Sequence, residues 1–224
     1  MLVKTYGAAL QGIDAITVTI EVNVQKGFNF CIVGLPDASV KESYQRVVSA
    51  LRESGYQFPH RGVVVNMAPA DIKKEGSAYD LPIAIGILVG SEQITSDCLD
   101  KYVIMGELSL DGSLQPVRGI LPMAIMARAK GFKGMIVPAA NATEAAVVNN
   151  LDVHGVNSLR EVVDFLRGAV RLEKVEFDTR AEFARAQQVL DLDFSEVKGQ
   201  ESVKRAFEVA CAGGHNILLV GAPG

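Results

Sequence analysis

MGELSLDGSLQPVRG, residues Met105–Gly119, contains a tight-turn signal at Asp111-Gly112. Glycine adopts the left-handed backbone conformation that two-residue hairpin turns require, so this dipeptide favours such a turn. The flanking segments Val103–Leu108 and Leu114–Val117 are apolar enough to form its two strands. The sequence therefore predicts a β-hairpin in the middle of the chain.

Strand and helix patterns alternate on both sides of this hairpin. Asp14–Val24 (DAITVTIEVNV) alternates with a period of two, which is typical of a half-buried strand. Val40–Leu51 has apolar residues at helical spacing, and Asp80–Val89 is apolar nearly all round, as in a helix packed inside a domain. Further strands are predicted at Phe28–Val33, Gly62–Met67, Gly134–Pro138 and Leu151–Val156, and further helices at Ile120–Lys130, near Thr143–Asn149, and after Ser158, which forms a capping box with Glu161. This alternation predicts an α/β (α+β) domain over residues 1–168.

The composition changes after this domain. Arg171–Ala186 is dense in charge, so residues 169–190 are predicted to form a linker with a solvated helix. Residues 191–224 are predicted to begin a new unit, with a helical stripe from Val203 to Cys211 and a buried strand at Asn216–Val220. We expect the printed sequence to end inside the glycine loop that follows this strand.

Composition and charge narrow the class of protein. Apolar residues make up 49% of the 224, which allows a well-buried core, and no uninterrupted apolar run reaches membrane-spanning length. The net charge of −4 argues against a module built mainly to grip phosphates, so any nucleic-acid contact needs a local basic patch or another part of the protein. Cys31, Cys98 and Cys211 share no metal-ligand spacing, and Cys31 is predicted to be a core residue. We expect a cytoplasmic protein without a membrane partner.

Three stretches together resemble a known peptidase domain. KKEGSAYDLPIAIGIL (Lys73–Leu88) and MGELSLDGSLQPVRG, followed by AKGFKGMIVP (Ala129–Pro138), resemble the Lon-type peptidase domain. The resemblance implies a fold of the ribosomal protein S5 domain 2-like type for residues 1–168. Lon-type peptidases use a serine activated by a lysine; on this alignment the serine position is Ala78 and the lysine position is Leu121. Because neither side chain can attack a carbonyl or carry a proton, we expect no catalytic dyad.

The C-terminal stretch resembles a different module. DFSEVKGQESVKRAFEVACAGGHNILLVGAPG resembles the start of an AAA+ ATPase module. The whole order of motifs is similar to the magnesium-chelatase-like AAA+ ATPases, the family that includes the competence protein ComM. That resemblance implies ATP and Mg²⁺ as cofactors of the full-length protein, a self-assembled ring of six subunits, and DNA as the partner of a branch-migration motor. It also implies nucleotide contacts at Gly221, Ala222, Pro223, Gly224, Val197, Gly199 and Gln200, with no complete ATPase site in these 224 residues.

Several residues near the expected peptidase site have simpler interpretations. Ser77 is interpreted as a helix-start residue, and Lys73 and Lys74 as solvated loop charges rather than parts of a shifted dyad. Asp80 is interpreted as a carboxylate that favours the dipole of its helix, with a subunit contact as the alternative. GLPDASVKES (Gly34–Ser43) is interpreted as a structural turn rather than an anion site. His60, His154 and His215 share no ligand spacing, so no metal site is predicted.

Alternatives to the DNA motor remain. One is an ATPase subunit for metal insertion into a tetrapyrrole, and another is a residual serine peptidase. A third is an interaction domain without motor activity.

Overall fold

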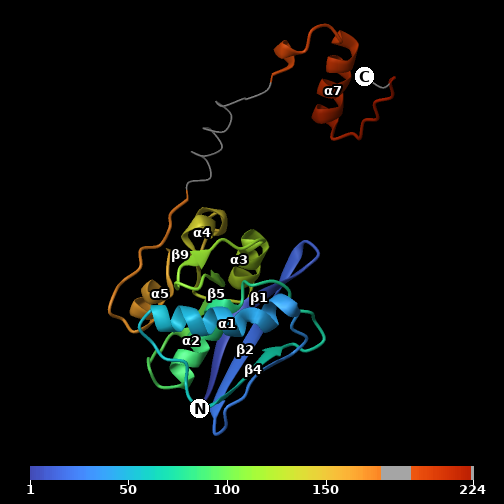
Figure 1. Ribbon diagram of the computed structural model, residues 1–224. Coiled ribbons are helices and arrows are strands. Elements are labelled where there is room, and N and C mark those ends of the chain that lie inside the picture. The colour runs from blue at the N-terminus through green and yellow to red at the C-terminus, as the bar shows by residue number, and fades with distance from the viewer. Residues whose placement is uncertain (178–192, 223–224) are drawn as a thin grey trace. The chain divides into compact units, whose positions relative to one another are not determined.

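The computed structural model describes residues 1–177 and 193–222, and the chain divides into two compact units, Met1–Phe177 and Asp178–Gly224. The first unit is built around a seven-stranded sheet with the order β3-β4-β2-β1-β5-β8-β9, and β6 and β7 form a separate hairpin (Figure 1). The strands are β1 (Leu2–Gln11), β2 (Asp14–Gln25), β3 (Phe30–Val33), β4 (Gly62–Ala68), β5 (Tyr102–Ile104), β6 (Glu107–Leu108), β7 (Leu114–Gln115), β8 (Gly134–Pro138) and β9 (Asp152–Val156). The helices are α1 (Ala38–Glu53), α2 (Asp80–Gly90), α3 (Ile120–Ala129), α4 (Ala139–Ala146), α5 (Leu159–Leu166) and α7 (Glu201–Gly213), with 3-10 turns at Leu99–Lys101 and Phe194–Glu196. The predicted mixed α/β class is confirmed, and most neighbouring strands are parallel.

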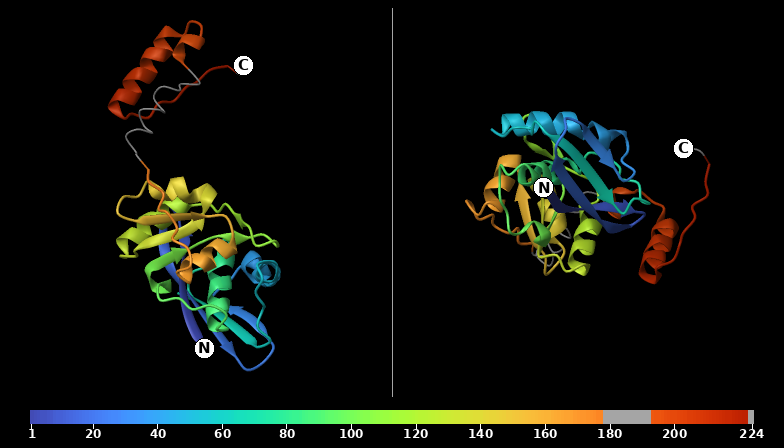
Figure 2. Two further views of the ribbon diagram at one scale, coloured as in Figure 1. Left: turned by 90° about the vertical axis from the view of Figure 1, so that its left-hand side faces the viewer. Right: turned by 90° about the horizontal axis from the view of Figure 1, so that it is seen from below.

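The strand β2 has the two-sided pattern that its sequence predicts. Val18, Ile20 and Val22 are buried on one face, where the helix α2 packs. A Cβ at Gly86 of α2 would lie 2.5 Å from the side chain of Val22, so glycine lets this helix approach the sheet closely. Thr17 points to the other face, where its hydroxyl donates to Met126 Sδ of α3 at 3.0 Å. Helices therefore cover both faces of the sheet (Figures 1 and 2).

The predicted central hairpin is present, but its first strand is shorter than expected. β6 pairs with β7 through Glu107↔Gln115 and Leu108↔Leu114, and Gly112 has the left-handed φ of +84° that the turn requires. Val103 belongs instead to β5 in the large sheet. The strand breaks because the backbone of Gly106 bonds to the start of α2 and to the segment before it: its N–H donates to Ala78 O at 2.9 Å, and its carbonyl accepts from Leu81 N of α2 at 3.0 Å.

Other predicted elements need correction in position. The helix expected near Thr143–Asn149 runs over Ala139–Ala146, because the chain turns into it directly after β8. The strand expected from Phe28 begins at Phe30, and Cys31 is exposed rather than buried. The prediction for Cys31 was wrong because FCIV is apolar throughout, so its sequence does not reveal which face of this edge strand is covered.

The charged segment after α5 contacts the first unit as far as Phe177. Val175 donates its N–H to Val153 O of β9 at 2.8 Å, and Leu172, Val175 and Phe177 pack against the core. Residues 171–177 contain no helix. The rest of the predicted linker helix falls on residues 178–192, outside the described residues.

The second unit contains the predicted helix but, within residues 193–222, no strand. α7 spans Glu201–Gly213, and Phe207 on this helix packs on Phe194 with ring centroids 5.9 Å apart. The strand expected at Asn216–Val220 is an irregular, exposed segment, because no neighbouring backbone among the described residues pairs with it.

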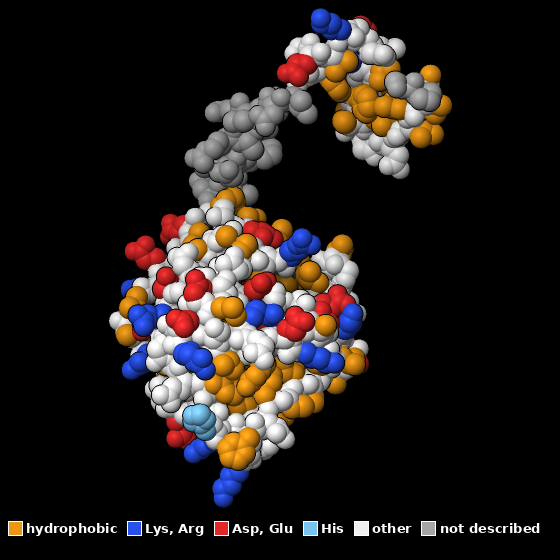
Figure 3. Space-filling model, viewed as in Figure 1, with side chains coloured by type: hydrophobic (Ala, Val, Ile, Leu, Met, Phe, Trp, Pro, Cys, Tyr) orange, Lys and Arg blue, Asp and Glu red, His pale blue; other side chains and the backbone are white. Residues whose placement is uncertain are grey.

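In the described residues no helix is both long and apolar enough to cross a bilayer. On the first unit, charged side chains of both signs are interspersed over the face where α1 lies, beside a patch of hydrophobic side chains (Figure 3).

Candidate functional site

A cleft of about 650 Å³ lies where the peptidase resemblance places the reactive centre. Its walls come from the end of β1, the loop before α2, the β6 strand and the segment that follows β7. The side chains that matter for its chemistry are Lys73, Ser77, Ala78, Tyr79, Glu107 and Arg118.

The two residues aligned with the peptidase dyad lie in different surroundings. Ala78 lines the cleft, and its carbonyl is fixed by the Gly106 N–H at 2.9 Å. Leu121 is not among the lining residues; it is half-buried against the core, and its N–H donates to Glu144 Oε1 at 3.0 Å. The structure therefore places only one of the two positions on the cleft wall.

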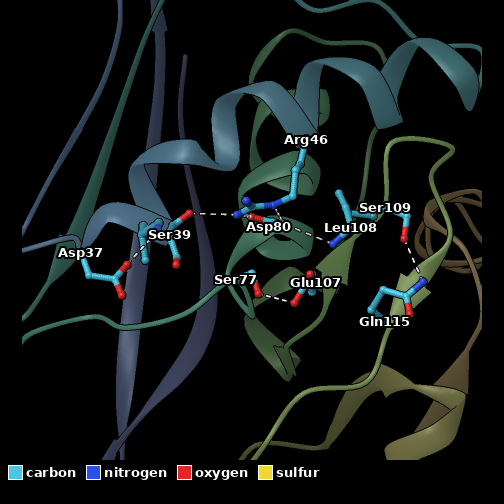
Figure 4. Close-up of polar contacts among 10 residues, drawn as sticks. Asp37, Ser39, Arg46, Ser77, Asp80, Glu107, Leu108, Ser109 and Gln115 are labelled. Carbon is cyan, nitrogen blue, oxygen red and sulfur yellow. Dashed lines mark hydrogen bonds and ion pairs between the residues drawn. The ribbon is translucent and has the colours of Figure 1, made fainter.

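The hydroxyl of Ser77 is held by a carboxylate. Ser77 Oγ donates to Glu107 Oε2, so the serine in this cleft is paired with an acid from β6 (Figure 4). Ser77 precedes the helix by three residues, because α2 begins at Asp80 and has Tyr79 as its N-cap. The interpretation of Ser77 as the helix-start residue is therefore corrected: it links the loop to the β6 strand.

The two neighbouring lysines have opposite environments. Lys73 is exposed, and its amine lies 2.6 Å from Glu75 Oε1. Lys74 is fully buried, and its amine donates to the carbonyls of Pro69 and Ile72, the latter at 2.7 Å. Burial lowers the pKa of Lys74. The prediction of two solvated loop charges was correct for Lys73 and wrong for Lys74, whose ammonium is enclosed by backbone oxygens.

Behind the cleft, Asp80 is tied to Arg46 rather than to the helix dipole alone. Arg46 Nε lies 2.6 Å from Asp80 Oδ2, and Arg46 Nη2 lies 2.9 Å from Asp80 Oδ1 (Figure 4). The same carboxylate accepts from Leu108 N at 3.2 Å, so it joins α1, α2 and the β6 strand. Burial raises the pKa of Asp80 to about 6, although the Arg46 hydrogen bonds act in the opposite direction. Asp80 is buried in the first turn of α2, the position that the dipole interpretation requires, and its pairing with Arg46 is an additional contact that the sequence did not indicate.

The Gly34–Ser43 turn also holds the loop before α2 that lines the cleft. Asp37 is the N-cap of α1: its Oδ1 accepts from Val40 N at 2.8 Å, and its Oδ2 accepts from Gly76 N at 3.1 Å. Asp37 therefore connects the start of α1 to the loop that carries Ser77. The interpretation of this segment as a structural turn is confirmed.

The far rim of the cleft is fixed by a buried amide. Asn141 of α4 accepts from Val117 N at 2.9 Å and donates to Val117 O at 2.8 Å. This two-point contact orients the segment from Pro116 to Arg118. Across the cleft, Tyr79 OH donates to Ala8 O at 2.9 Å, and burial raises the pKa of this phenol. Both walls are thus held by hydrogen bonds between distant parts of the chain.

The residues implied to contact nucleotide are only partly described. Gly199 and Gln200, just before α7, have left-handed φ values of +69° and +61°. Val197 is exposed, and Gly221 and Ala222 lie in an irregular segment with free space around Gly221. Pro223 and Gly224 lie outside the described residues.

Within the described ranges, no group of three His, Cys, Asp or Glu side chains could hold a metal ion. His154 is buried beside Tyr102 and Phe165, with ring centroids 5.7 and 5.1 Å away, so it is a packing residue. Burial lowers its pKa.

Sequence reasoning missed three features of this region: the acid partner of Ser77, the enclosure of Lys74, and the Arg46–Asp80 pair. Arg46 and Asp80 lie 34 residues apart, so no local spacing points to their contact. The only available signal was a charged residue at the start of a helix that is otherwise apolar all round.

The fold, the cleft and the second unit together define a magnesium-chelatase-like AAA+ protein. The family described as "Subunit ChlI of Mg-chelatase" matches residues 20–141, and "Magnesium chelatase, subunit ChlI" matches residues 193–224. The chain belongs to this magnesium-chelatase-like family, which includes the competence protein ComM.

Individual relatives agree with this assignment. The chain is 42% identical over 217 residues to the uncharacterized protein YifB of Escherichia coli, covering 96% of this chain and 42% of that protein. It is 39% identical over 224 residues to the competence protein ComM of Haemophilus influenzae, covering 100% of this chain and 44% of that protein. It is also 28% identical over 127 residues to Lon protease 2 of Bacillus subtilis, which covers 55% of this chain and 22% of that protein. The chain thus spans less than half the length of YifB and ComM.

Proposed function

We propose that the intact protein is an ATP-hydrolysing motor that acts on DNA in recombination and transformation. In this proposal it forms a ring of six subunits, moves along DNA and promotes branch migration. The observation that carries the proposal is the 39% identity to the competence protein ComM along the whole chain. The three cysteines are free in the described structure, which supports placing the protein in the reducing cytoplasm.

The first unit is proposed to share the ribosomal protein S5 domain 2-like fold and to guide assembly or substrate rather than to cut peptides. Ser77 is bound to Glu107, and the amine of Lys74 is bound to backbone carbonyls. A serine-lysine mechanism needs a neutral amine within hydrogen-bond reach of the hydroxyl. A peptidase assay with Ser77→Ala as the control tests this: hydrolysis that depends on Ser77 would revive the peptidase alternative.

The nucleotide site is proposed to begin at Gly221–Gly224, whose backbone N–H groups would hold phosphates. Val197, Gly199 and Gln200 would lie against the adenine. ATP and Mg²⁺ are the proposed cofactors of the intact protein, and the Mg²⁺ would neutralise charge on the transferred phosphoryl group.

The second candidate is an ATPase subunit for metal insertion into a tetrapyrrole. It is favoured by the matching family, which is described as a subunit of magnesium chelatase. The two candidates differ in which ligand accelerates ATP hydrolysis by the intact protein. We expect stimulation by single-stranded or forked DNA and none by a porphyrin; stimulation by the porphyrin alone would reverse the choice.

A further inference from the structure

A second concave region of the first unit uses none of the cleft residues. Two hollows of about 550 and 300 Å³ share the segment Gln57–Arg61, and together we call them the aromatic groove. Its lining residues are Phe28, Tyr44, Val48, Arg52, Tyr56, Gln57, Phe58, Pro59, His60, Arg61, Ser91 and Gln93. The groove lies where helix α1 ends and the chain turns toward β4.

Four aromatic side chains line the groove, namely Phe28, Tyr44, Tyr56 and Phe58. Tyr44 and Phe58 lie 5.4 Å apart in an edge-to-face arrangement, and Phe30 packs on Tyr44 at 4.8 Å. These three rings are half-buried, so they keep a fixed orientation while leaving part of each ring accessible. Phe28 is 90% exposed at the mouth of the groove. A single exposed ring is common on protein surfaces, but Phe28 lines the same hollow as Tyr44 and Phe58 and so extends its aromatic lining.

The charge of the lining is basic. Arg52 and Arg61 are exposed, and neither forms an ion pair with a carboxylate within residues 1–177 and 193–222. His60 lies beside them, and the described residues that line the two hollows include no Asp or Glu. Glu53 follows Arg52 along α1 but is not a lining residue. The groove is therefore a local basic surface on a chain whose net charge is −4.

The groove is held in shape by its own hydrogen bonds. Gln57 N donates to Gln93 Oε1 at 2.9 Å, and Gln93 Nε2 donates to Gln57 O at 2.7 Å. This exchange fastens the segment that carries Phe58, His60 and Arg61 to the end of α2. On this face Figure 3 shows hydrophobic side chains gathered together, with a histidine and basic side chains at their margin.

We propose that the aromatic groove binds single-stranded nucleic acid. Bases would stack on the exposed aromatic faces, Phe28 first, while Arg52 and Arg61 contact phosphates. A proline-rich peptide would leave the arginines without partners, and an acidic peptide would make no use of the stacking surfaces. A polyanion that carries planar rings, as single-stranded nucleic acid does, would pair with the arginines and also stack on the aromatic side chains. The inference deepens the proposed function by giving the first unit its own DNA contact.

The test uses the 224-residue chain and a fluorescent oligothymidylate of about 12 nucleotides, a length within the range that one such groove covers. Fluorescence anisotropy should report binding at low salt. With two phosphates neutralised, log K should fall against log salt with a slope of about −1.4. A duplex of the same length should bind more weakly, because its bases are already stacked.

Variants with matched controls separate stacking from general charge. Phe28→Ala should weaken binding about fivefold or more, since a stacked base contributes roughly that much. Ile13→Ala, at a side chain equally exposed at 90%, should leave affinity unchanged. Arg52→Gln with Arg61→Gln should remove most of the salt dependence, whereas Arg128→Gln with Lys130→Gln, on exposed residues at the end of α3, should not.

Three results would overturn the proposal: no oligonucleotide binding at low salt, binding indifferent to Phe28 and to the arginine pair, or capture of a proline-rich or acidic peptide in preference to the oligonucleotide. The proposed motor function is judged separately, by DNA-stimulated ATPase of the intact protein. Stimulation without binding by this chain would refute only the groove. Binding by this chain without stimulation would refute only the motor.

Discussion

Arg46 and Asp80 form a two-point ion pair between α1 and α2, with the shorter N–O distance at 2.6 Å. The Asp80 side chain is almost completely buried, whereas the Arg46 side chain keeps a fifth of its surface exposed. Because Asp80 also accepts from Leu108 N, one carboxylate positions two helices and the β6 strand that carries Glu107. The shape of the cleft therefore depends on a contact outside its walls.

Removing one partner of this pair should cost more than removing both. Arg46→Met leaves a buried carboxylate without its cation, and we expect a loss of about 3–5 kcal/mol in the free energy of unfolding. Adding Asp80→Asn should recover part of that loss, because the buried charge is gone. Urea unfolding at pH 7 of the wild type, the two single variants Arg46→Met and Asp80→Asn, and the double variant measures the coupling energy between the two side chains. Strictly additive losses would mean that the pair is not coupled.

The titration of Asp80 sets a pH dependence of stability. Its pKa is raised by burial to about 6 in the folded protein, against about 4 in an unfolded chain. Between these values the folded state binds more protons, so the stability contributed by this group is complete below about pH 4 and declines as pH rises through about 6. Carboxyl carbon NMR should show Asp80 titrating near 6. The wild type should lose stability relative to Asp80→Asn over the same interval; a flat difference would contradict the assignment.

Truncation of Lys74 should destabilise the protein far more than truncation of Lys73. Lys74→Ala would leave a cavity and two carbonyls without their donor, so we expect a loss of about 2–4 kcal/mol. Lys73→Ala removes an exposed side chain, and its effect should stay within about 0.5 kcal/mol. Chemical unfolding of both variants tests the contrast. Equal effects would mean that Lys74 is not enclosed as described.

Gly34 should tolerate no side chain. Its φ is +100°, and an added Cβ would lie 2.1 Å from the carbonyl oxygen of Met67. Gly131 has a comparable φ of +78° but no atom within 4 Å of the same position. Gly131→Ala should therefore cost only about 1 kcal/mol of backbone strain, whereas Gly34→Ala should cost several times more or prevent folding. Thermal unfolding of the two variants measures the difference.

The sequence correctly predicted those helices and strands whose form depends on neighbouring residues in the chain. The alternation of β2 was confirmed because the faces of a strand are fixed by a period of two. One half of the capping box was confirmed, because Ser158 Oγ accepts from Glu161 N at 3.3 Å, but the Glu161 carboxylate accepts from Asn157 N rather than from Ser158 N. The all-round burial of α2 followed from its composition, and every residue from Asp80 to Gly90 is buried.

Features that depend on the path of a loop, or on residues far apart in the sequence, could not be predicted in this way. Lys74 was expected in solvent because lysine is rarely buried, and its two carbonyl acceptors become neighbours only through the turn from Pro69 to Ile72. The aromatic groove joins residues from the loop after β2, from α1 and from the segment before β4. No single stretch of sequence contains that combination. In the cleft, the alignment identified Ala78 and Leu121 but did not reveal that only Ala78 faces the cavity.

Because the amine of Lys74 is buried and that of Lys73 is exposed, chemical acylation of the two lysines can report the conformation of the cleft loop. An acylating reagent in water can reach Lys73, whereas the adjacent amine is protected for as long as the loop keeps its shape. Mass spectrometry of partially acylated protein would therefore give the ratio of acylated Lys74 to acylated Lys73. That ratio would report when the loop opens, whether through a ligand, a partner subunit or heat, without any label attached to the protein.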